Sequence, residues 1–316
     1  MPLFPPLEGL DGAWTNREAT ITQSIPKRLV ILGGNVVGTE LAQAFQTLGS
    51  QVTLIEGAER LLAGEEEHAS AQVTEALAGY GVDVRTGSDA TKVSRDGGTI
   101  TVTTADGRTA AGDELLVALG RKPATETLGL ETVGLTPGGH VDVDMRMRVP
   151  GHPWLYAIGD INGRALFTHM GKYQARLAAD CVLGHNHAIS HGADGPLSPR
   201  VVFTDPQVAA VGHTTTTAAE AGLEIDVYDT ETSGNAGGSF YGRGAAGTAR
   251  FLIDRERRIL VGCTITGSDV ADFLHAATIA IVGEVPVARL RHAVPAFPTR
   301  SEIWLNLLEK AETGAP

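Results

Sequence analysis

The clearest pattern of hydrophobic and polar positions lies near the start of the chain, over residues 29–56. A run of aliphatic residues, Leu29–Leu32, ends at Gly33, and apolar residues then recur at helical spacing over 37–48. A glycine ends that pattern, and a second apolar run over 52–56 ends in an acid. Short aliphatic runs that stop at glycine are typical of buried strands, and a period of three to four residues is typical of a helix. This order predicts a strand, a tight turn, a helix and a second strand.

The unit has the spacing of a dinucleotide-binding βαβ motif. The positions of a G-x-G-x-x-G turn are occupied by Gly33, Gly34, Asn35, Val36, Val37 and Gly38. The first glycine permits the tight turn, the last permits close helix packing, and the helix N-terminus offers N–H groups to a pyrophosphate. Glu56 stands where an acid accepts hydrogen bonds from the ribose. Asn35 replaces the middle glycine, and we expect the turn to survive because asparagine tolerates a positive φ. The alternative is a buried crossover that binds no ligand.

The pattern after residue 56 predicts shorter elements. Helical spacing is found over residues 66–79 and 168–183. Strand-like runs are found at residues 82–85, 90–94, 99–103, 115–119 and 155–158. Glycine turns at 96–98 and 105–107 favour a β-meander, whereas residues 125–152 are loop-like.

The last third of the chain has a different order of elements. Strands are predicted at residues 200–204, 208–212, 224–230, 247–254 and 259–266, and helices at 268–282 and 299–311. Strands followed by helices favour an α+β domain with an antiparallel sheet. The threonine tract 214–217 is predicted to cap a helix. The full fold class predicted is α/β, with a Rossmann-like unit, a β-meander and this α+β domain.

Composition and charge exclude several classes of function. The chain has 316 residues, 42% of them hydrophobic, which is enough for two or three globular domains. A formal net charge of -12 repels phosphate backbones, so we expect no nucleic-acid partner. No apolar run has membrane-spanning length and no signal peptide is evident, so we expect a cytoplasmic protein without a membrane partner. Cys181 and Cys263 lie in apolar surroundings and are expected to be buried thiols with structural roles.

Six short motifs follow one another along nearly the whole chain. They are the glycine turn 33–40, Glu56, Ala-Leu-Gly-Arg-Lys-Pro at 118–123, Tyr-Ala-Ile-Gly-Asp at 156–160, Phe-Thr-Asp-Pro at 203–206 and Phe-Pro-Thr-Arg-Ser-Glu at 297–302. Their order resembles that in the pyridine nucleotide–disulfide oxidoreductases, such as dihydrolipoamide dehydrogenase and mercuric reductase. That family forms homodimers and uses FAD and NAD(P). The resemblance implies a remnant of the FAD domain at 1–26, an NAD(P)-binding domain at 27–124, the C-terminal part of the FAD domain with a linker at 125–195, and an interface (dimerisation) domain at 196–316.

The resemblance also implies roles for individual residues. Gly159 and Asp160 would contact the flavin ribityl chain, and Thr168 would lie near the isoalloxazine. Further cofactor contacts are expected at Glu40 beside the nicotinamide, at Ala90 near the adenine, and at Gly120. Glu56 resembles NAD-preferring members because its charge would repel a 2′-phosphate, although the nearby Arg60 leaves NADPH possible.

Two departures from the family pattern concern redox chemistry. The family's FAD domain has its own G-x-G-x-x-G turn and a redox Cys-x4-Cys pair, and neither occurs in this sequence. Dithiol members have a His-Pro-Thr segment whose histidine is an acid/base, but here Phe297 takes that position while Glu302 is retained. We therefore predict no catalytic residue for disulfide chemistry. Residues 5–10 resemble the segment just before the NAD(P) domain, so we expect a truncated member with only half of the FAD site.

We therefore expect an oxidoreductase that passes hydride from NAD(P)H via FAD to a small non-disulfide acceptor such as a quinone. The alternative is a non-catalytic dinucleotide-binding and dimerisation module that acts with a separate flavin domain. A third possibility is a misplaced start codon. No metal is expected: His185, His187 and His191 are most simply solvated linker histidines, and the acidic run 65–67 is most simply the first turn of a helix.

Overall fold

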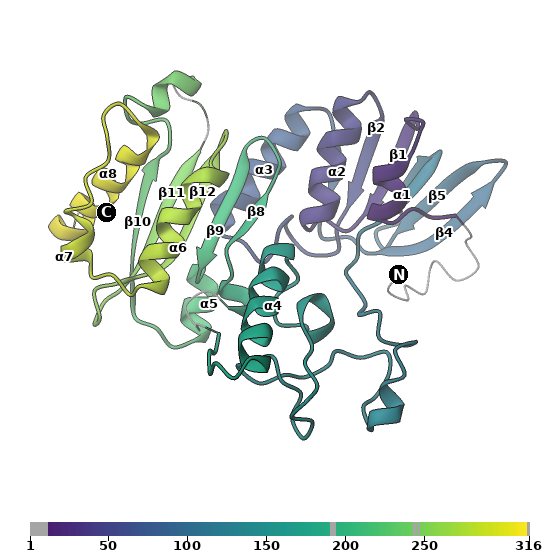
Figure 1. Cartoon of the computed structure of the whole chain (residues 1–316). Helices are drawn as coiled ribbons and strands as arrows, with labels where there is room; N and C mark the ends of the chain where they lie inside the picture. Colours follow the sequence, from purple (N-terminus) through teal and green to yellow (C-terminus); the bar gives the residue numbers. More distant parts are fainter. Residues whose placement is uncertain (1–11, 190–193, 243–244, 246, 315–316) are drawn as a thin grey trace.

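The computed structural model describes residues 12–189, 194–242, 245 and 247–314. Their strands form a four-stranded, a three-stranded and a five-stranded sheet. Figure 1 shows the N-terminal elements on one side, the C-terminal sheet and helices on the other, and the middle of the chain with α4 below them. The mixed α/β fold class predicted from the sequence is confirmed. The predicted attachment segment 1–26 and the motif at 5–10 lie wholly or partly outside the described residues.

The N-terminal unit is built on a parallel sheet with strand order β3-β2-β1-β7. Its strands are β1 (Arg28–Leu32), β2 (Gln51–Ile55), β3 (Asp83–Arg85) and β7 (Glu114–Val117). Its crossover helices are α2 (Val36–Thr47) and α3 (Glu67–Gly79). Leu32 at the end of β1 is in register with Ile55 and Val117. The carboxyl ends of three strands therefore meet at one edge, where ligands bind in open α/β sheets.

A β-meander covers part of this unit, as predicted. It consists of β4 (Ala90–Asp96), β5 (Thr99–Thr104) and β6 (Thr109–Gly112), which pair antiparallel in that order. The third strand was not predicted, because its sequence Thr-Ala-Ala-Gly has almost no strand-like alternation. The predicted strand at 82–85 instead belongs to the parallel sheet, as β3. A short helix, α1 (Asn16–Ile21), precedes β1, and Trp14 packs against Phe45.

The middle of the chain contains one long helix, α4 (Thr168–Val182), and the short 3-10 turns η2 (Leu130–Val133), η3 (Gly159–Asn162) and η5 (Gly195–Leu197). The strand predicted at 155–158 is wrong. Tyr156 makes only an isolated antiparallel bridge with Arg148. Ala157 N–H donates to Met147, and Leu155 accepts from Val149, so one edge of the segment is paired. A strand needs a ladder of such pairs, which periodicity in the sequence does not reveal.

The C-terminal unit is an α+β domain, as predicted. Its antiparallel sheet has the order β10-β11-β12-β9-β8, made of β8 (Arg200–Val202), β9 (Gln207–Gly212), β10 (Ile225–Glu231), β11 (Thr248–Asp254) and β12 (Leu260–Gly267). Its helices are α5 (Thr215–Glu220), η6 (Gly238–Tyr241), η7 (Ala271–Phe273), α6 (Leu274–Val282), α7 (Val287–Leu290), η8 (Arg300–Glu302) and α8 (Ile303–Thr313). Phe251 and Trp304 meet edge to face, with ring centroids 4.6 Å apart. The sheet and α8 therefore share an aromatic core.

The hydrophobic core of the N-terminal unit continues into the C-terminal unit. Val202 of β8 and Val208 of β9 belong to the same buried cluster as Leu54 and Leu61. The two units are therefore packed against each other through apolar side chains as well as polar contacts. Within the described residues, no helix is long and apolar enough to cross a membrane.

Candidate functional site

The turn after β1 requires glycine at two positions. Gly33 has φ +103, and a Cβ atom there would lie 2.5 Å from the carbonyl oxygen of Ala118. A Cβ on Gly38 would lie 1.7 Å from the carbonyl oxygen of Gly33. Real Cβ atoms essentially never approach within 3.0 Å, so neither position accepts a side chain unless the backbone moves. The roles predicted for these two glycines are therefore supported by the geometry of the turn.

Asn35 fits the turn for a reason different from the predicted one. Its φ is -83, so it occupies ordinary extended backbone, and the positive φ lies at Gly33 instead. Asn35 is the N-cap of α2, and its side chain makes no capping hydrogen bond. The leading N–H groups of α2, from Val36, Val37 and Gly38, thus receive no acceptor from this side chain. An N-terminus of this kind fits the charge and hydrogen-bonding of a pyrophosphate.

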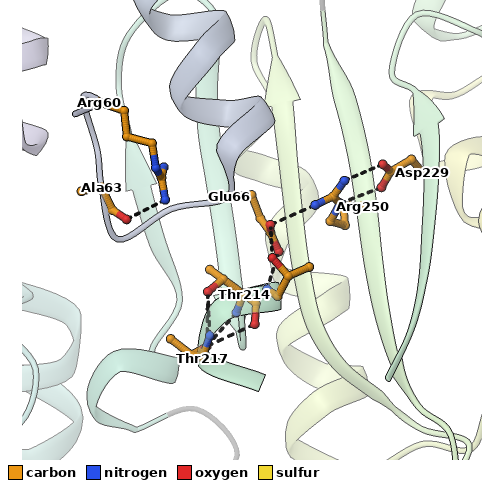
Figure 2. Close-up of polar contacts among 8 residues, drawn as sticks. Arg60, Ala63, Glu66, Thr214, Thr217, Asp229 and Arg250 are labelled. Carbon is orange, nitrogen blue, oxygen red and sulfur yellow. Dashed lines mark hydrogen bonds and ion pairs between the residues drawn. The ribbon is translucent and has the colours of Figure 1, made fainter. Parts of the chain in front are cut away.

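Glu56 lies directly beside this turn. Its carboxylate accepts a hydrogen bond from Gly34 N–H at 2.5 Å and another from Ala58 N–H at 2.7 Å. The acid is therefore held at the carboxyl end of β2, next to the glycine turn, where a ribose would lie. Arg60 donates to the carbonyl of Ala63 at 2.8 Å, within its own loop (Figure 2). To pair with a 2′-phosphate, the Arg60 guanidinium would have to break its hydrogen bond with the Ala63 carbonyl.

The remaining residues predicted for this nucleotide are Glu40 on α2, Ala90 at the start of β4 and Gly120 after β7. Glu40 of α2 accepts a hydrogen bond from Phe203 N–H at 2.8 Å, which ties the helix to the loop after β8. Burial raises the pKa of the Glu40 carboxyl, although the Phe203 N–H acts in the opposite direction. Ala90 is buried at the start of β4, and Gly120 has φ +132 just after β7. No described contact brings Ala90 to the glycine turn, so its role stays a prediction.

The Gly159–Asp160 turn forms a second candidate site. Gly159 has φ +71, and its N–H donates to the side-chain oxygen of Gln174 in α4 at 2.7 Å. Asp160 pairs with Arg121 at 3.0 Å, so the segment after β7 contacts this turn. Gln174 is fully buried, and its amide nitrogen has no partner among the described residues. Thr168 begins α4 at the end nearest the turn. A positive-φ glycine beside a buried amide donor without an acceptor fits close approach of a polar cofactor.

The loop before η8 carries Phe297, at the position where the sequence resemblance places a histidine. Phe297 is 77% exposed, and its side chain has no group that can carry a proton. Glu302 is retained, and one of its carboxylate oxygens is buried without a partner in the described part of the chain. The base of the loop is fixed by Arg300, whose guanidinium lies over the rings of Tyr241 at 4.3 Å and Phe273 at 4.9 Å. The loop is therefore anchored at Arg300 by cation–π contacts, and its Phe297 ring is exposed to solvent.

The two cysteines are both free and differ in environment. Cys263 is buried in β12, and burial strongly raises the pKa of its thiol. Cys181 is only half buried, with its thiol donating to the carbonyl of His187 at 3.4 Å, so the expectation that it is buried is wrong. His187 also contacts Asp180 at 3.0 Å, but the described residues hold no group of metal-ligating side chains. His191 lies outside the described residues.

The acidic run 65–67 has a role that the sequence did not reveal. Only Glu67 lies in the first turn of α3, while Glu66 is its N-cap and makes no capping hydrogen bond. Glu66 instead pairs with Arg250 of β11 at 2.9 Å (Figure 2). His68 lies nearby, and neither of its buried ring nitrogens has a partner among the described residues. Burial, assisted by the Arg250 charge, lowers the pKa of His68. The sequence of the run indicates only negative charge. Arg250, which pairs with Glu66, is distant in the sequence.

Comparisons with protein families and with curated proteins show what the chain is similar to. Residues 2–179 match the family described as pyridine nucleotide-disulphide oxidoreductase, and residues 198–307 match the dimerisation domain of that family. The dihydrolipoyl dehydrogenase of Bacillus subtilis (strain 168) is 32% identical over 304 residues, covering 94% of this chain and 63% of that protein. The mercuric reductase of Shigella flexneri is 34% identical over 298 residues, covering 92% of this chain and 51% of that protein. The chain thus spans about six tenths of the length of the dihydrolipoyl dehydrogenases it matches.

Two solved structures share the fold of this chain. LpdA from Mycobacterium tuberculosis superposes with a TM-score of 0.84 at 25% identity, covering 94% of this chain and 64% of that one. The HOCl-induced flavoprotein disulfide reductase RclA from Escherichia coli gives a TM-score of 0.85 at 25% identity, covering 98% of this chain and 70% of that one. Both likenesses extend over the N-terminal unit, the middle segment and the C-terminal unit.

Proposed function

Because this chain belongs to the pyridine nucleotide-disulphide oxidoreductases, we propose that it acts in hydride transfer from NAD(P)H, through FAD, to an acceptor that is not a disulfide. The observation that carries the proposal is that the segment after β7 lies beside both candidate sites. Ala118 approaches Gly33 of the turn, and Arg121 pairs with Asp160 at 3.0 Å. A quinone is the acceptor class we favour.

The nucleotide site supports NAD(H) as the hydride donor. The helix N-terminus at Asn35 would receive the pyrophosphate, and Glu56 would accept hydrogen bonds from the adenosine ribose. A 2′-phosphate would be repelled by Glu56, while Arg60 is occupied by its own loop. Glu40 is placed on the same helix, where it would contact the nicotinamide. These contacts favour NADH over NADPH.

The flavin would be held on this chain by Gly159, Asp160 and Thr168. When bound, it would relay the two electrons of the hydride to the second substrate. The residues of this chain would orient it: Gln174 fixes Gly159, and Arg121 fixes the carboxylate of Asp160. These contacts supply part of a flavin site.

The choice of a non-disulfide acceptor rests on Phe297. A dithiol reaction needs a group that donates and accepts a proton beside a reactive thiolate. Phe297 stands where the family resemblance places a histidine, and it carries no such group. A quinone accepts one hydride equivalent and one proton, and the proton can come from solvent. The exposed aromatic ring of Phe297 also suits stacking on a planar acceptor.

The dimerisation domain supports a homodimer as the working unit. Besides Phe297, the large apolar side chains exposed on the C-terminal unit include Ile279, Val282 and Val294. Exposed apolar groups on a domain of this family are consistent with a surface that a second copy covers.

A comparison of acceptors tests the proposed function. The purified chain is mixed with FAD, and NADH oxidation is followed with benzoquinone or with lipoamide as the acceptor. We expect quinone-dependent oxidation to exceed lipoamide-dependent oxidation by at least about tenfold, which corresponds to roughly 1.4 kcal/mol in the barrier. Equal rates with the two acceptors, or lipoamide reduction alone, would overturn the choice of acceptor.

Two observations favour a second candidate, a dinucleotide-binding and dimerisation module that works with a separate flavin domain. Segment 155–158 is paired along one edge, and α4 ends in Val182 and Leu183, which are largely exposed. Titration with FAD separates the two candidates. Saturable flavin binding by the chain alone favours the oxidoreductase, whereas NADH binding without flavin binding favours the module.

A further inference from the structure

The loop between β2 and α3, residues 57–66, contacts the glycine turn at one end. Leu62 N–H donates to the carbonyl oxygen of Gly34 at 2.9 Å. Leu61 is fully buried and lies so close to Gly34 that a Cβ atom there would come within 2.4 Å of its side chain. The loop therefore contacts the turn through both Leu61 and Leu62.

The other end of the same loop is held by the dimerisation domain. Glu66 is 2% exposed, and its carboxylate accepts three hydrogen bonds from that domain. Thr215 of α5 donates its N–H at 2.8 Å and its hydroxyl at 2.9 Å, and Arg250 donates at 2.9 Å. Figure 2 shows Glu66 at the end of its loop, reaching toward Arg250 on the neighbouring sheet. A buried carboxylate with this donor set is fixed in position.

Arg250 is in turn fixed within its own sheet. It forms two parallel hydrogen bonds with Asp229, at 2.8 and 2.7 Å, and the two residues face each other in the β10–β11 register. A neighbouring contact repeats the arrangement, because Arg200 of β8 pairs with Glu65 at 2.7 Å. The end of the loop is thus bound by two arginines that belong to the dimerisation domain.

Backbone strain inside the loop indicates what these contacts do. Leu62 has φ 49, a left-handed conformation that is unfavourable for a residue with a branched side chain, and it is buried. Such a conformation persists only when the surroundings over-determine it. Since Leu62 itself donates to Gly34, relaxation of this residue would move the turn.

We propose that Glu66 and Arg250 are positioning residues through which the dimerisation domain holds loop 57–66 and the dinucleotide-binding turn in place. They act on the turn through Leu61 and Leu62. The expected effect on NADH affinity rests on the proposed function. The restraint of Leu62 by the contact between the two units does not depend on that function.

The test compares Glu66→Gln with a matched control, Arg255→Met. Arg255 pairs with Asp226 at 3.0 Å across the same two-strand hairpin, but it is 57% exposed and does not contact the loop. Hydrogen exchange of the Leu62 amide is measured on the whole purified chain, together with NADH binding. We expect Glu66→Gln to speed exchange over residues 57–66 at least tenfold and to weaken NADH binding about fivefold, with β1 amides unchanged. Arg255→Met should change neither quantity.

Several results would overturn the proposal. One is unchanged Leu62 exchange in a folded Glu66→Gln chain, another is faster exchange without weaker binding, and a third is the same effect in Arg255→Met. If Glu66→Gln does not fold, Arg250→Lys serves in its place, because it keeps the charge but cannot bond to Asp229 and Glu66 simultaneously in the same planar geometry. A wild-type chain that fails to bind NADH would refute the proposed function, and Leu62 exchange would then decide the positioning role alone.

Discussion

The close contact between α2 and the glycine turn makes Gly38→Ala the most informative single change. The added Cβ would lie 1.7 Å from the Gly33 carbonyl oxygen and 2.9 Å from its carbonyl carbon. Since 3.0 Å is the practical limit, the helix and the turn must separate by about 1.3 Å. Forcing a methyl group into a close-packed site typically costs about 1–3 kcal/mol. We expect Gly38→Ala to lower the free energy of unfolding by that amount.

The same displacement should weaken nucleotide binding. The N–H groups at the start of α2 would move away from the position proposed for the pyrophosphate, and the loss of one charge-assisted hydrogen bond costs about 1.5–3 kcal/mol. NADH affinity should therefore fall about 10- to 100-fold. Urea unfolding measures the stability, and NADH fluorescence titration below the unfolding transition measures the affinity.

Gly79→Ala is the matched control for this change. It adds the same methyl group to the other crossover helix, where a Cβ atom would meet nothing within 4 Å. Because alanine is favoured over glycine in a helix, this variant should be as stable as the wild type or gain up to about 1 kcal/mol. Its NADH affinity should be unchanged. A folded Gly38→Ala chain that binds NADH like the wild type would refute the assignment of the turn.

Two further predictions concern titratable groups outside the turn. His68 has a lowered pKa because it is buried, so the unfolded chain binds the proton more tightly and stability should fall as the pH drops below about 6.5. His68→Leu should reduce this loss of stability and should stabilise the chain by roughly 1 kcal/mol at neutral pH. Urea unfolding at several pH values measures both effects. A variant that loses stability more steeply than the wild type as the pH falls would contradict the role of His68. Iodoacetamide should label Cys181 in the folded chain and Cys263 only after unfolding, as followed by mass spectrometry, because burial raises the pKa of Cys263; rapid labelling of Cys263 would contradict its burial.

Local patterns allowed most of the first unit to be predicted. The aliphatic run of β1, the glycines of the turn and the acid after β2 are all close in sequence, so the βαβ arrangement follows from short-range rules. The antiparallel C-terminal sheet was predicted for the same reason, since each strand has its own apolar run. The predicted helix at 268–282 begins later, as η7 and α6, because Asp269 adopts a left-handed turn with φ 51.

Features that depend on distant partners were missed or misread. Segment 155–158 has the composition of a buried strand, yet its pairing depends on which segments lie beside it. The orientation of Gln174 toward Gly159 depends on the packing of α4 against the turn, which no local pattern indicates. Asn35 was expected to tolerate a positive φ, but in the structure the positive φ of the turn belongs to Gly33. Backbone conformation within a turn is set jointly by its residues and their packing.

The prediction that the acidic run 65–67 forms the first turn of a helix is right for Glu67 only. Acids near the start of a helix are favoured by its dipole, and that effect is worth less than about 1 kcal/mol at an exposed position. A buried carboxylate must be compensated more strongly, because removal from water costs several kcal/mol. Glu66 meets that requirement through Arg250 and Thr215, which lie about 150 to 180 residues away. The magnitude of the desolvation penalty therefore decides between the two explanations, and it places Glu66 at the contact between the two units.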